Sequence, residues 1–447
     1  MLRLITPSSV FRLQKIVSVA GALISLHLLC CAVAVAGALE EYVDKPDLHY
    51  NWKRTEQKRE GWGTATRLEM VSQHWRDQFW SHHMIVVRPN ELRNPGIGFL
   101  FITGDGDGEK RIEMLKTLAE RAGAVAAVIT KIPNQPLYEG RKEDALIAYT
   151  FDQYLKTGDE TWPLLFPMVK GAVRGMDTVQ AFAREEFNQK IGKFVVAGAS
   201  KRGWTTWLSG AVDARVKAIA PMVIDMLNMK AQLQWSKKVY GKQSEEINDY
   251  TEMRFDQRQD EPGMVKLRSW VDPYEYRSRY TMPKLLLLGT NDRYWTVDSL
   301  RNYWNDLPAP KLIYQTPNAG HDLNGGKEAI QTLAAFYEMI ADGKELPKME
   351  WKIGDGANDE ATVEVSVNEK AKAIRLWTAN SSDRDFRDEP WSSRELEAQP
   401  GSSHAVAEIK TPKKGYRAYL AEVELTAPDG HSYKLSTEAR VTPDTIK

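Results

Sequence analysis

The feature that most constrains the fold is a series of short, continuous apolar runs separated by segments with helical spacing. GFLFIT (98–103), AVAAVIT (124–130) and KLLLL (284–288) have the composition of strands that are buried on both faces. Because such strands alternate with amphipathic segments over residues 40–346, we predict a mostly parallel sheet covered by helices on both sides. The predicted strands are 64–72, 84–89, 98–103, 124–130, 193–197, 216–223, 284–288 and 311–315, and the predicted helices are 111–122, 143–155, 162–187, 202–212 and 325–341.

Two segments depart from this alternation. Residues 225–280 are polar, helix-prone and rich in tyrosine and tryptophan, and they are too long for an ordinary connection between strands, so we predict a helical cap. Residues 348–447 contain runs that alternate with period two, such as ATVEVSV at 361–367, and an Asp429-Gly430 pair typical of a hairpin turn before a strand at 433–441. This C-terminal part is predicted to be a small all-β sandwich domain.

The N-terminal segment, residues 1–36, has the pattern of a targeting sequence. Arg3, Arg12 and Lys15 precede an almost wholly apolar stretch, and Ala34-Val35-Ala36 fits a small-residue cleavage site. We therefore expect an exported protein, periplasmic or secreted. The stretch is also long enough to span a bilayer, so the alternative is an uncleaved anchor, which would be the only membrane contact. The only cysteines, Cys30 and Cys31, lie in this segment, so no disulfide framework is expected in the mature chain.

Charge excludes some classes of partner. The 447 residues contain 60 basic and 60 acidic side chains, so no basic field predicts nucleic-acid binding. The nearest thing to a charge run, residues 53–60, mixes both signs and is interpreted as a solvated face. We expect a small-molecule or peptide substrate of unknown identity and no cofactor.

Residues 193–203, KFVVAGASKRG, place a serine between a buried strand and a helix. A strand-turn-helix of this kind lifts a nucleophilic serine above the carboxyl edge of a sheet in α/β-hydrolases, where the pattern is G-x-S-x-G. Here Gly198 is in place, but the second glycine, Gly203, comes one residue late. Arg202 occupies the position that should be crowded, so we expect the turn to open or Arg202 to point to solvent. The alternative is that Ser200 merely caps the helix.

A nucleophilic serine needs a histidine base and a carboxylate, which on this fold type follow in the order serine, acid, histidine. Asp292 comes just past the strand 284–288, and His321 just past the strand 311–315. Asp298 competes with Asp292 for the role of the acid, but the sequence around Asp298 is typical of a helix start, where an aspartate serves as a cap. Ser200, Asp292 and His321 are therefore the candidate catalytic residues.

The oxyanion of an acyl-transfer reaction needs two backbone N–H donors. We predict Lys201, directly after the nucleophile, and the loop GDGDG after the strand 98–103, with Gly104 and Asp105 as the donors. The rival interpretation of this loop as a phosphate or calcium site is disfavoured, because it lacks the P-loop lysine and the EF-hand spacing. His82 and His83 are adjacent in a predicted strand and point to opposite faces, so no metal site is expected.

The segment 272–285, the pairs Asn291-Asp292 and Gly320-His321, and the run Ala199-Ser200-Lys201-Arg202-Gly203-Trp204 together resemble the PhoPQ-activated pathogenicity-related protein family. The similarity covers most of the mature chain. It implies an exported protein with an α/β-hydrolase fold, and it implies that the late glycine is the family's own form of the serine turn. It does not supply a substrate.

Two functions remain open at this stage. The first is an exported serine hydrolase that cleaves an ester or amide bond, in which Lys201 and Arg202 favour an anionic substrate or simply lie on a solvated helix start. The second is a non-catalytic binding or signalling protein on an α/β-hydrolase scaffold, in which the sandwich and the aromatic cap bind a partner.

Overall fold

A computed structural model describes residues 37–355, 360–398 and 403–446, which belong to one compact unit. The predicted leader or anchor, residues 1–36, lies outside the described residues. Within the described ranges, no helix is long and apolar enough to cross a membrane. Because the chain from Gly37 onward is a single unit, its division into a hydrolase domain and a sandwich domain stays a prediction.

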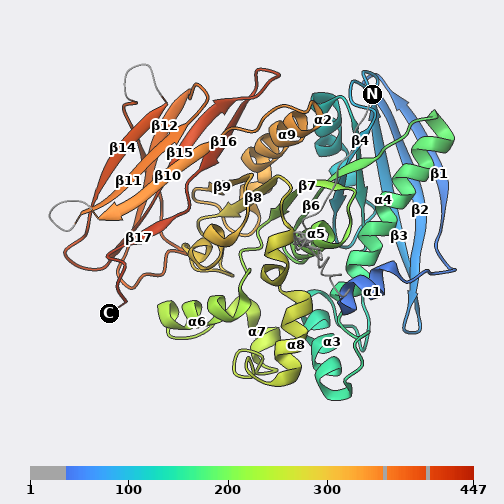
Figure 1. The fold of residues 1–447 in the computed structure, drawn as a ribbon, viewed down its shortest axis with the longest axis horizontal. Coiled ribbons are helices and arrows are strands. Elements are labelled where there is room, and N and C mark those ends of the chain that lie inside the picture. Colours follow the sequence, from blue (N-terminus) through green and yellow to red (C-terminus); the bar gives the residue numbers. More distant parts are fainter. Residues whose placement is uncertain (1–36, 356–359, 399–402, 447) are drawn as a thin grey trace, which may run out of the picture. The chain divides into compact units, whose positions relative to one another are not determined.

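The central sheet runs through the middle of the described chain (Figure 1). In spatial order its described strands are β1-β2-β3-β5-β4-β6-β7-β8-β9. The first three strands form an antiparallel meander, and β3 pairs antiparallel with β5. The pairs from β5 to β9 in this order are parallel. The strands are β1 (Asn51–Glu60), β2 (Gly63–Trp75), β3 (Gln78–Pro89), β4 (Ile97–Ile102), β5 (Val125–Ile129), β6 (Lys193–Ala199), β7 (Val216–Met222), β8 (Lys284–Gly289) and β9 (Lys311–Thr316).

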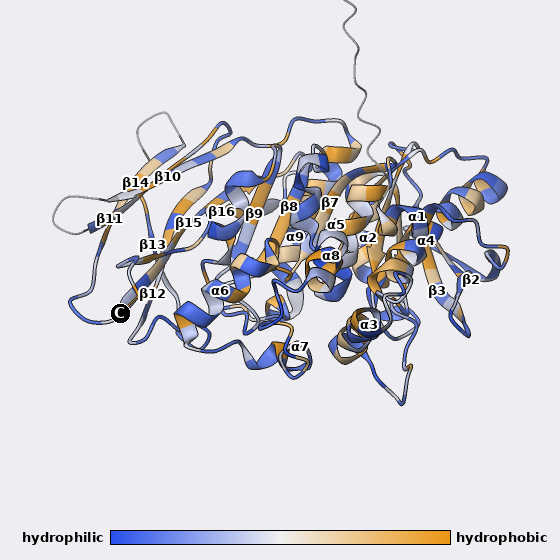
Figure 2. Ribbon diagram, turned by 60° about the horizontal axis from the view of Figure 1, so that its bottom comes forward, coloured by the Kyte–Doolittle hydropathy of each residue, from blue (hydrophilic) through white to orange (hydrophobic). Residues whose placement is uncertain are grey.

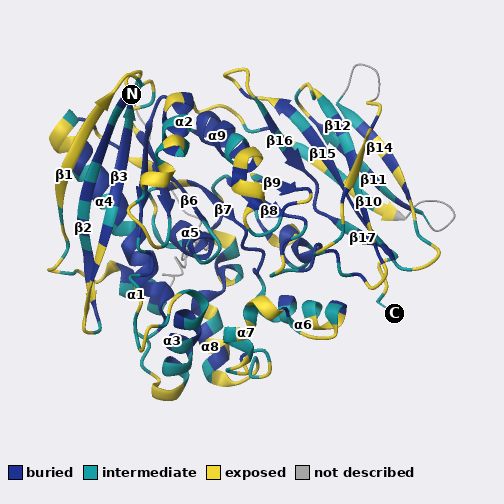
Figure 3. Cartoon of the chain, turned by 180° about the vertical axis from the view of Figure 1, so that it is seen from behind, coloured by how far each residue is buried: buried dark blue, intermediate teal, exposed yellow. Residues whose placement is uncertain are grey.

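Strand β1 was not predicted, although its residues were expected to be solvated, and that expectation is confirmed. All but one of its residues are exposed, which Figure 3 shows as a largely yellow edge strand. A strand exposed on both faces carries no apolar alternation, so only its pairing with β2 shows that it is a strand. Its mixed charges protect the sheet edge from pairing with another chain.

Helices cover both faces of the sheet, as predicted. Alternate residues of one strand enter different cores: Met84 and Val86 of β3 belong to a buried cluster that includes residues of α3, α4 and α5, whereas Ile85 and Val87 belong to one that includes residues of α2 and α9. Figure 2 shows the apolar residues concentrated in the central strands and in the helices beside them. The helices are α1 (Ala38–Asp44), α2 (Ile112–Ala122), α3 (Glu143–Thr157), α4 (Leu165–Phe187), α5 (Lys201–Val212), α6 (Met229–Tyr240), α7 (Asn248–Thr251), α8 (Pro262–Val271) and α9 (Lys327–Ala341).

The predicted cap lies between β7 and β8 and consists of α6, α7 and α8 with short 3-10 turns. The C-terminal strands form two antiparallel sheets, in the orders β10-β11-β14 and β13-β12-β15-β16, with β17 also paired to β15. Their bounds are β10 (Met349–Asp355), β11 (Glu360–Val367), β12 (Ala373–Ser381), β13 (Ser392–Glu395), β14 (His404–Lys410), β15 (Tyr416–Thr426), β16 (Ser432–Ser436) and β17 (Arg440–Thr442).

The prediction of one strand at 433–441 was wrong, because β16 and β17 are separate. The end of β16 and the residues after it bond the end of β9: Gln315 N–H donates to Ser436 Oγ (2.9 Å), and Ala439 N–H donates to Gln315 Oε1 (2.7 Å). The apolar core on the α9 side of the central sheet continues into the sandwich, for example through Val363 and Val423.

Candidate active site

Ser200 lies on a strained turn between β6 and α5. Its φ of 57° and ψ of −126° fall where side chains other than glycine are rare, and its hydroxyl makes no helix-capping hydrogen bond. The capping alternative is therefore wrong. A Cβ added at Gly198 would lie 2.6 Å from the carbonyl oxygen of Arg202, and one at Gly203 would lie 2.9 Å from the carbonyl oxygen of Met222. The late glycine thus allows α5 to pack against the end of β7.

Arg202 does not point to solvent, so the second of the two expected alternatives is wrong. The residue is 8% exposed, and its guanidinium donates to both carboxylate oxygens of Glu143 on α3 (2.5 and 2.7 Å) and to the carbonyl oxygen of Ile132 (2.5 Å). Burial raises the pKa of Glu143, but the hydrogen bonds and charge of Arg202, together with Gln135 and Lys201, outweigh burial and lower that pKa to about 2. A partly buried bidentate ion pair therefore links the start of α5 to α3.

The neighbouring Lys201 is also paired rather than solvated. Its Nζ lies 2.7 Å from Asp144 Oδ2, and Tyr250 of the cap donates to the other oxygen of Asp144 (2.9 Å). Since Lys201 and Arg202 are both bound to carboxylates of α3, neither is a free cation. The interpretation that they favour an anionic substrate therefore loses its basis.

Asp292 and His321 lie together where β8 and β9 end. His321 Nδ1 is 2.9 Å from Asp292 Oδ2, and Asp292 Oδ1 accepts the backbone N–H of Tyr294 (3.0 Å). The Tyr294 ring stacks on the imidazole with 4.3 Å between the centroids. His321 Nε2 is buried and has no hydrogen-bond partner in the part of the chain that the structure describes, so it is free to accept a proton. No hydrogen bond joins Ser200 and His321 among these residues, and catalytic contacts are often loose without substrate.

The loops that carry Asp292 and His321 are held by the segment 382–391, which connects β12 to β13. Asn291 Nδ2 donates to the carbonyl oxygens of Phe386 (3.1 Å) and Glu389 (2.9 Å). Asn318 makes a reciprocal pair with the Trp391 backbone, at 3.0 and 2.7 Å. Sequence reasoning missed both asparagines. Their positions, one residue before Asp292 and three before His321, were the available signal.

Asp298, the rival acid, has a different role from the one predicted. It makes no helix-capping bond. It is 1% exposed and binds Arg384 of the C-terminal part (3.0 Å), Arg301 (3.1 Å) and Trp235 of α6 (3.0 Å). Although burial raises its pKa, Arg384 holds the pKa of Asp298 below the usual value. Asp298 therefore links the cap to the C-terminal strands.

Asp225 is a buried carboxyl group that the sequence reasoning placed only at the start of the cap. It is 3% exposed and accepts a hydrogen bond from Tyr303 (2.7 Å). Burial, helped by the negative charge of Asp292, raises the pKa of Asp225 to about 8 against the lowering effect of the Tyr303 hydrogen bond. A small cavity separates Asp225 from Asp292.

The predicted oxyanion donors lie at neighbouring strand ends. Lys201 is the first residue of α5, whose first-turn N–H groups have no partner within the helix. β4 pairs with β6 up to Ile102 and Gly198, and a Cβ added at Gly104 would lie 2.2 Å from the Arg202 guanidinium. Gly104 is thus beside the serine turn, whereas Asp105 is exposed and 3.4 Å from Lys142.

Two hollows of different character meet at this site. Ser200 lines a cavity of about 110 Å³, whose other walls are mainly apolar side chains of α3, α5 and the cap. His321 lines an open cleft of about 450 Å³ with Asn318, Arg293, Arg387 and charged residues around them. Tyr294 borders both hollows.

No group of three or more potential ligand side chains that could hold a metal occurs in the described ranges. His82 bonds Ser72 Oγ (2.8 Å) and the Thr130 carbonyl oxygen (2.9 Å), and burial lowers its pKa to about 4. It is a satisfied core histidine.

Comparisons with known proteins agree with this architecture. The chain is 30% identical over 471 residues to the autocrine proliferation repressor protein A of Dictyostelium discoideum, covering 95% of this chain and 94% of that protein. An acetyl xylan esterase from a Paenibacillus species superposes with a TM-score of 0.50 at 15% identity, covering 67% of this chain and 92% of the esterase. Acetyl xylan esterase 1 from a Thermoanaerobacterium species gives a TM-score of 0.46 at 14% identity, with the same coverage of 67% and 92%.

At this level of identity, the structural likeness shows the fold, a mostly parallel α/β-hydrolase sheet with separate antiparallel sheets at the C-terminus. The family model for the PhoPQ-activated pathogenicity-related proteins matches residues 39–387, which include Ser200, Asp292, His321 and most of the segment 382–391. The chain therefore belongs to the PhoPQ-activated pathogenicity-related protein family.

Proposed function

We propose that this protein is a serine hydrolase with Ser200 as nucleophile, His321 as general base and Asp292 as the residue that orients the imidazole. The observation that carries the proposal is the His321–Asp292 contact of 2.9 Å, made through Nδ1, while the buried Nε2 has no hydrogen-bond partner among the described residues. The strained turn at Ser200 supports it, because such strain is typical of functional sites. The esterase names of the structural neighbours favour an ester over an amide substrate.

In the proposed mechanism, Ser200 Oγ attacks the carbonyl carbon while His321 Nε2 takes its proton. The backbone N–H groups of Lys201 and of Gly104 or Asp105 bind the oxyanion. His321 then protonates the leaving group, and a water molecule releases the acyl group from Ser200 by the reverse proton transfers. Asp292 stabilises the imidazolium and fixes the tautomer.

The test is labelling with a fluorophosphonate probe together with hydrolysis of p-nitrophenyl butyrate by the purified mature protein. Ser200→Ala should abolish both signals, and Ser269→Ala, which changes an exposed serine on α8, should leave both unchanged. Undiminished labelling of Ser200→Ala would refute the assignment.

We propose that the protein is exported after cleavage behind Ala36. The basis is the pattern of residues 1–36 alone. Mass spectrometry of the extracellular or periplasmic protein should give a chain that begins at Gly37. A chain that retains the apolar segment in the membrane fraction would support the anchor instead.

A signalling role without catalysis is the second candidate, favoured by the name of the Dictyostelium relative, a proliferation repressor that matches 95% of this chain. The purified protein and Ser200→Ala can be added to Dictyostelium discoideum cells. Equal slowing of proliferation by both, without ester hydrolysis by either, would support signalling over catalysis.

A further inference from the structure

The two hollows beside the candidate catalytic residues would bind chemically different groups. The Ser200 cavity is walled by aromatic, aliphatic and methionine side chains from helices and loops of both the core and the cap. Six of them are Phe151, Trp204, Met226, Leu233, Phe255 and Leu267. Such a surface binds an apolar group by excluding water and offers it few hydrogen bonds.

The size of this cavity limits the apolar group. Its volume of about 110 Å³ is somewhat below the ~150 Å³ of an apolar cavity that takes up one benzene molecule. A chain of roughly four to six carbons fits such a space, and a long fatty acyl chain does not.

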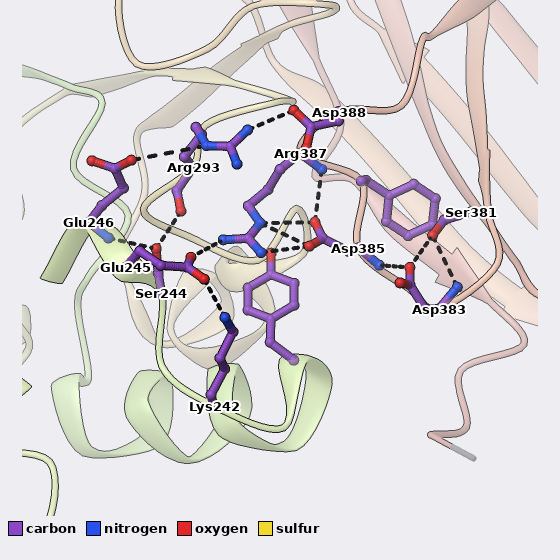
Figure 4. A network of polar contacts seen from close by, with 12 residues as sticks. Lys242, Ser244, Glu245, Glu246, Arg293, Ser381, Asp383, Asp385, Arg387 and Asp388 are labelled. Carbon is purple, nitrogen blue, oxygen red and sulfur yellow. Dashed lines mark hydrogen bonds and ion pairs between the residues drawn. The ribbon is translucent and has the colours of Figure 1, made fainter. Parts of the chain in front are cut away.

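The His321 cleft is polar, and its cations are already paired. Arg293 lies 2.6 Å from Asp388, and Arg387 lies 2.6 Å from Asp385 and 3.2 Å from Glu245. In Figure 4 these arginines lie beside Glu245 and Glu246, which follow α6 in the cap, and beside the acidic residues Asp385 and Asp388 of the segment 382–391. A charged ligand would have to break an ion pair, whereas a neutral hydroxylated one can add hydrogen bonds to the existing pairs.

The chemistry assigns each hollow to one half of an ester. His321 must protonate the leaving oxygen, so the alcohol half lies on the His321 side. The acyl half then lies in the cavity that Ser200 lines. Resting on the proposed function, we infer that the substrates are short-chain acyl esters, of roughly four to six acyl carbons, of a neutral hydroxylated alcohol.

The reaction is balanced without a cofactor. The acyl carbon forms a bond to Ser200 Oγ while its bond to the alcohol oxygen breaks, and the serine proton passes through His321 to that oxygen. Water then forms a bond to the acyl carbon while the bond from that carbon to Ser200 Oγ breaks. The proton from the water passes through His321 to Ser200 Oγ. The products are the alcohol and a short carboxylic acid.

The acyl half is tested with p-nitrophenyl acetate, butyrate, hexanoate and dodecanoate. We expect kcat/KM to be highest for butyrate or hexanoate and at least about tenfold lower for dodecanoate, because a pocket discriminates by about tenfold or more per methylene. Leu233→Trp, which narrows the cavity, should shift the optimum to acetate. Gln234→Trp, the exposed neighbour on α6, should not. An optimum at acetate or dodecanoate in the wild type, or no shift in Leu233→Trp with an unchanged melting temperature, would overturn the inference.

The alcohol half is tested with glyceryl monobutyrate and propyl butyrate, which differ only by two hydroxyl groups on a three-carbon alcohol. We expect the glyceryl ester to have a kcat/KM about tenfold higher. Arg293→Gln should reduce this preference, and Lys242→Gln, outside the cleft, should keep it. Equal rates for the two esters, or faster propyl butyrate, would refute the assignment of the cleft.

Binding separates failure of the inference from failure of the proposed function. Ser200→Ala should bind glyceryl monobutyrate in a calorimetric titration, and Ser200→Ala/Leu233→Trp should bind it at least about tenfold more weakly. Absence of binding to Ser200→Ala overturns the inference. Binding together with full hydrolysis by Ser200→Ala overturns the nucleophile instead.

Discussion

The Ser200 turn and the loops of Asp292 and His321 are held in place by different parts of the molecule. Ser200 is positioned by β6, α5 and the Arg202–Glu143 pair, all within the α/β part. The other two loops are fixed by Asn291 and Asn318, which bond the segment 382–391 of the C-terminal part. The C-terminal strands are therefore expected to adjust the acid and base, whereas the nucleophile turn is independent of them.

The largest expected effect is on the His321 side of this comparison. Asp292→Asn keeps the size of the side chain but favours the wrong tautomer of His321, so kcat should fall by about 10⁴-fold. Steady-state hydrolysis of p-nitrophenyl butyrate measures the change. Asp298→Asn should instead lower the melting temperature, and a comparable loss of kcat in that variant at unchanged folding would contradict the choice of Asp292.

Asn318→Ala tests the support from the C-terminal part. The His321 loop loses its pair of bonds to Trp391, so we expect kcat to fall by about 10- to 100-fold, as small misplacements of catalytic groups do. With p-nitrophenyl butyrate as substrate, KM should change little, because the butyryl chain is expected to bind in the Ser200 cavity and not in the cleft that Asn318 lines. Asn324→Ala, which removes a bond within the same loop to the Asn318 carbonyl oxygen (2.9 Å) and leaves the bonds to Trp391 intact, is the comparison variant and should lose less kcat. An unchanged kcat would mean that the segment 382–391 does not position His321.

Asp225→Asn tests the protonation of the buried carboxyl group that shares a small cavity with Asp292. Folding raises the pKa of Asp225 from 3.8 to about 8, so between these pH values the folded state retains a proton that the unfolded state releases. This group's contribution to stability is full below pH 4, falls by about 1.4 kcal/mol per pH unit as pH rises, and levels off above pH 8. Asparagine at position 225 does not titrate, so the variant lacks this pH-dependent loss of stability. Its amide oxygen can still accept the hydrogen bond from Tyr303.

Urea unfolding of wild type and Asp225→Asn at pH 5, 6 and 7 measures the effect. The difference in the free energy of unfolding should shift in favour of the variant as pH rises. A constant difference across this range would show that the pKa of Asp225 is not raised by folding.

The smallest expected effect is on the Ser200 side. Arg202→Lys cannot donate to both oxygens of Glu143 and to Ile132 at once, so it should cost about 1 kcal/mol of the free energy of unfolding. Arg293→Lys, an exposed pair, should cost less. Equal losses in the two variants, measured by urea unfolding, would show that the Arg202–Glu143 pair does not fix the turn.

Much of the fold could be predicted because burial on both faces leaves a continuous apolar run, as in β4, β5 and β8. The exposed strand β1 carries no such signal, and the break between β16 and β17 depends on Gln315, more than a hundred residues away. The candidate residues could be named because each follows a strand at the same edge of the sheet. The ion pair between Arg202 and Glu143 could not be predicted, since the two residues are distant in sequence.

What the sequence by itself determined is therefore most strands of the central sheet and the residues at their carboxyl ends, because local hydrophobic patterns and chain order suffice for both. Only the tertiary structure decided which partners the charged and amide side chains bind. Lys201 and Arg202 are neutralised by α3, Asp298 is bound to Arg384, and Asn318 is held by Trp391. These are contacts between segments far apart in the chain, and a side chain's local sequence does not specify which distant partner will lie beside it once the core has formed.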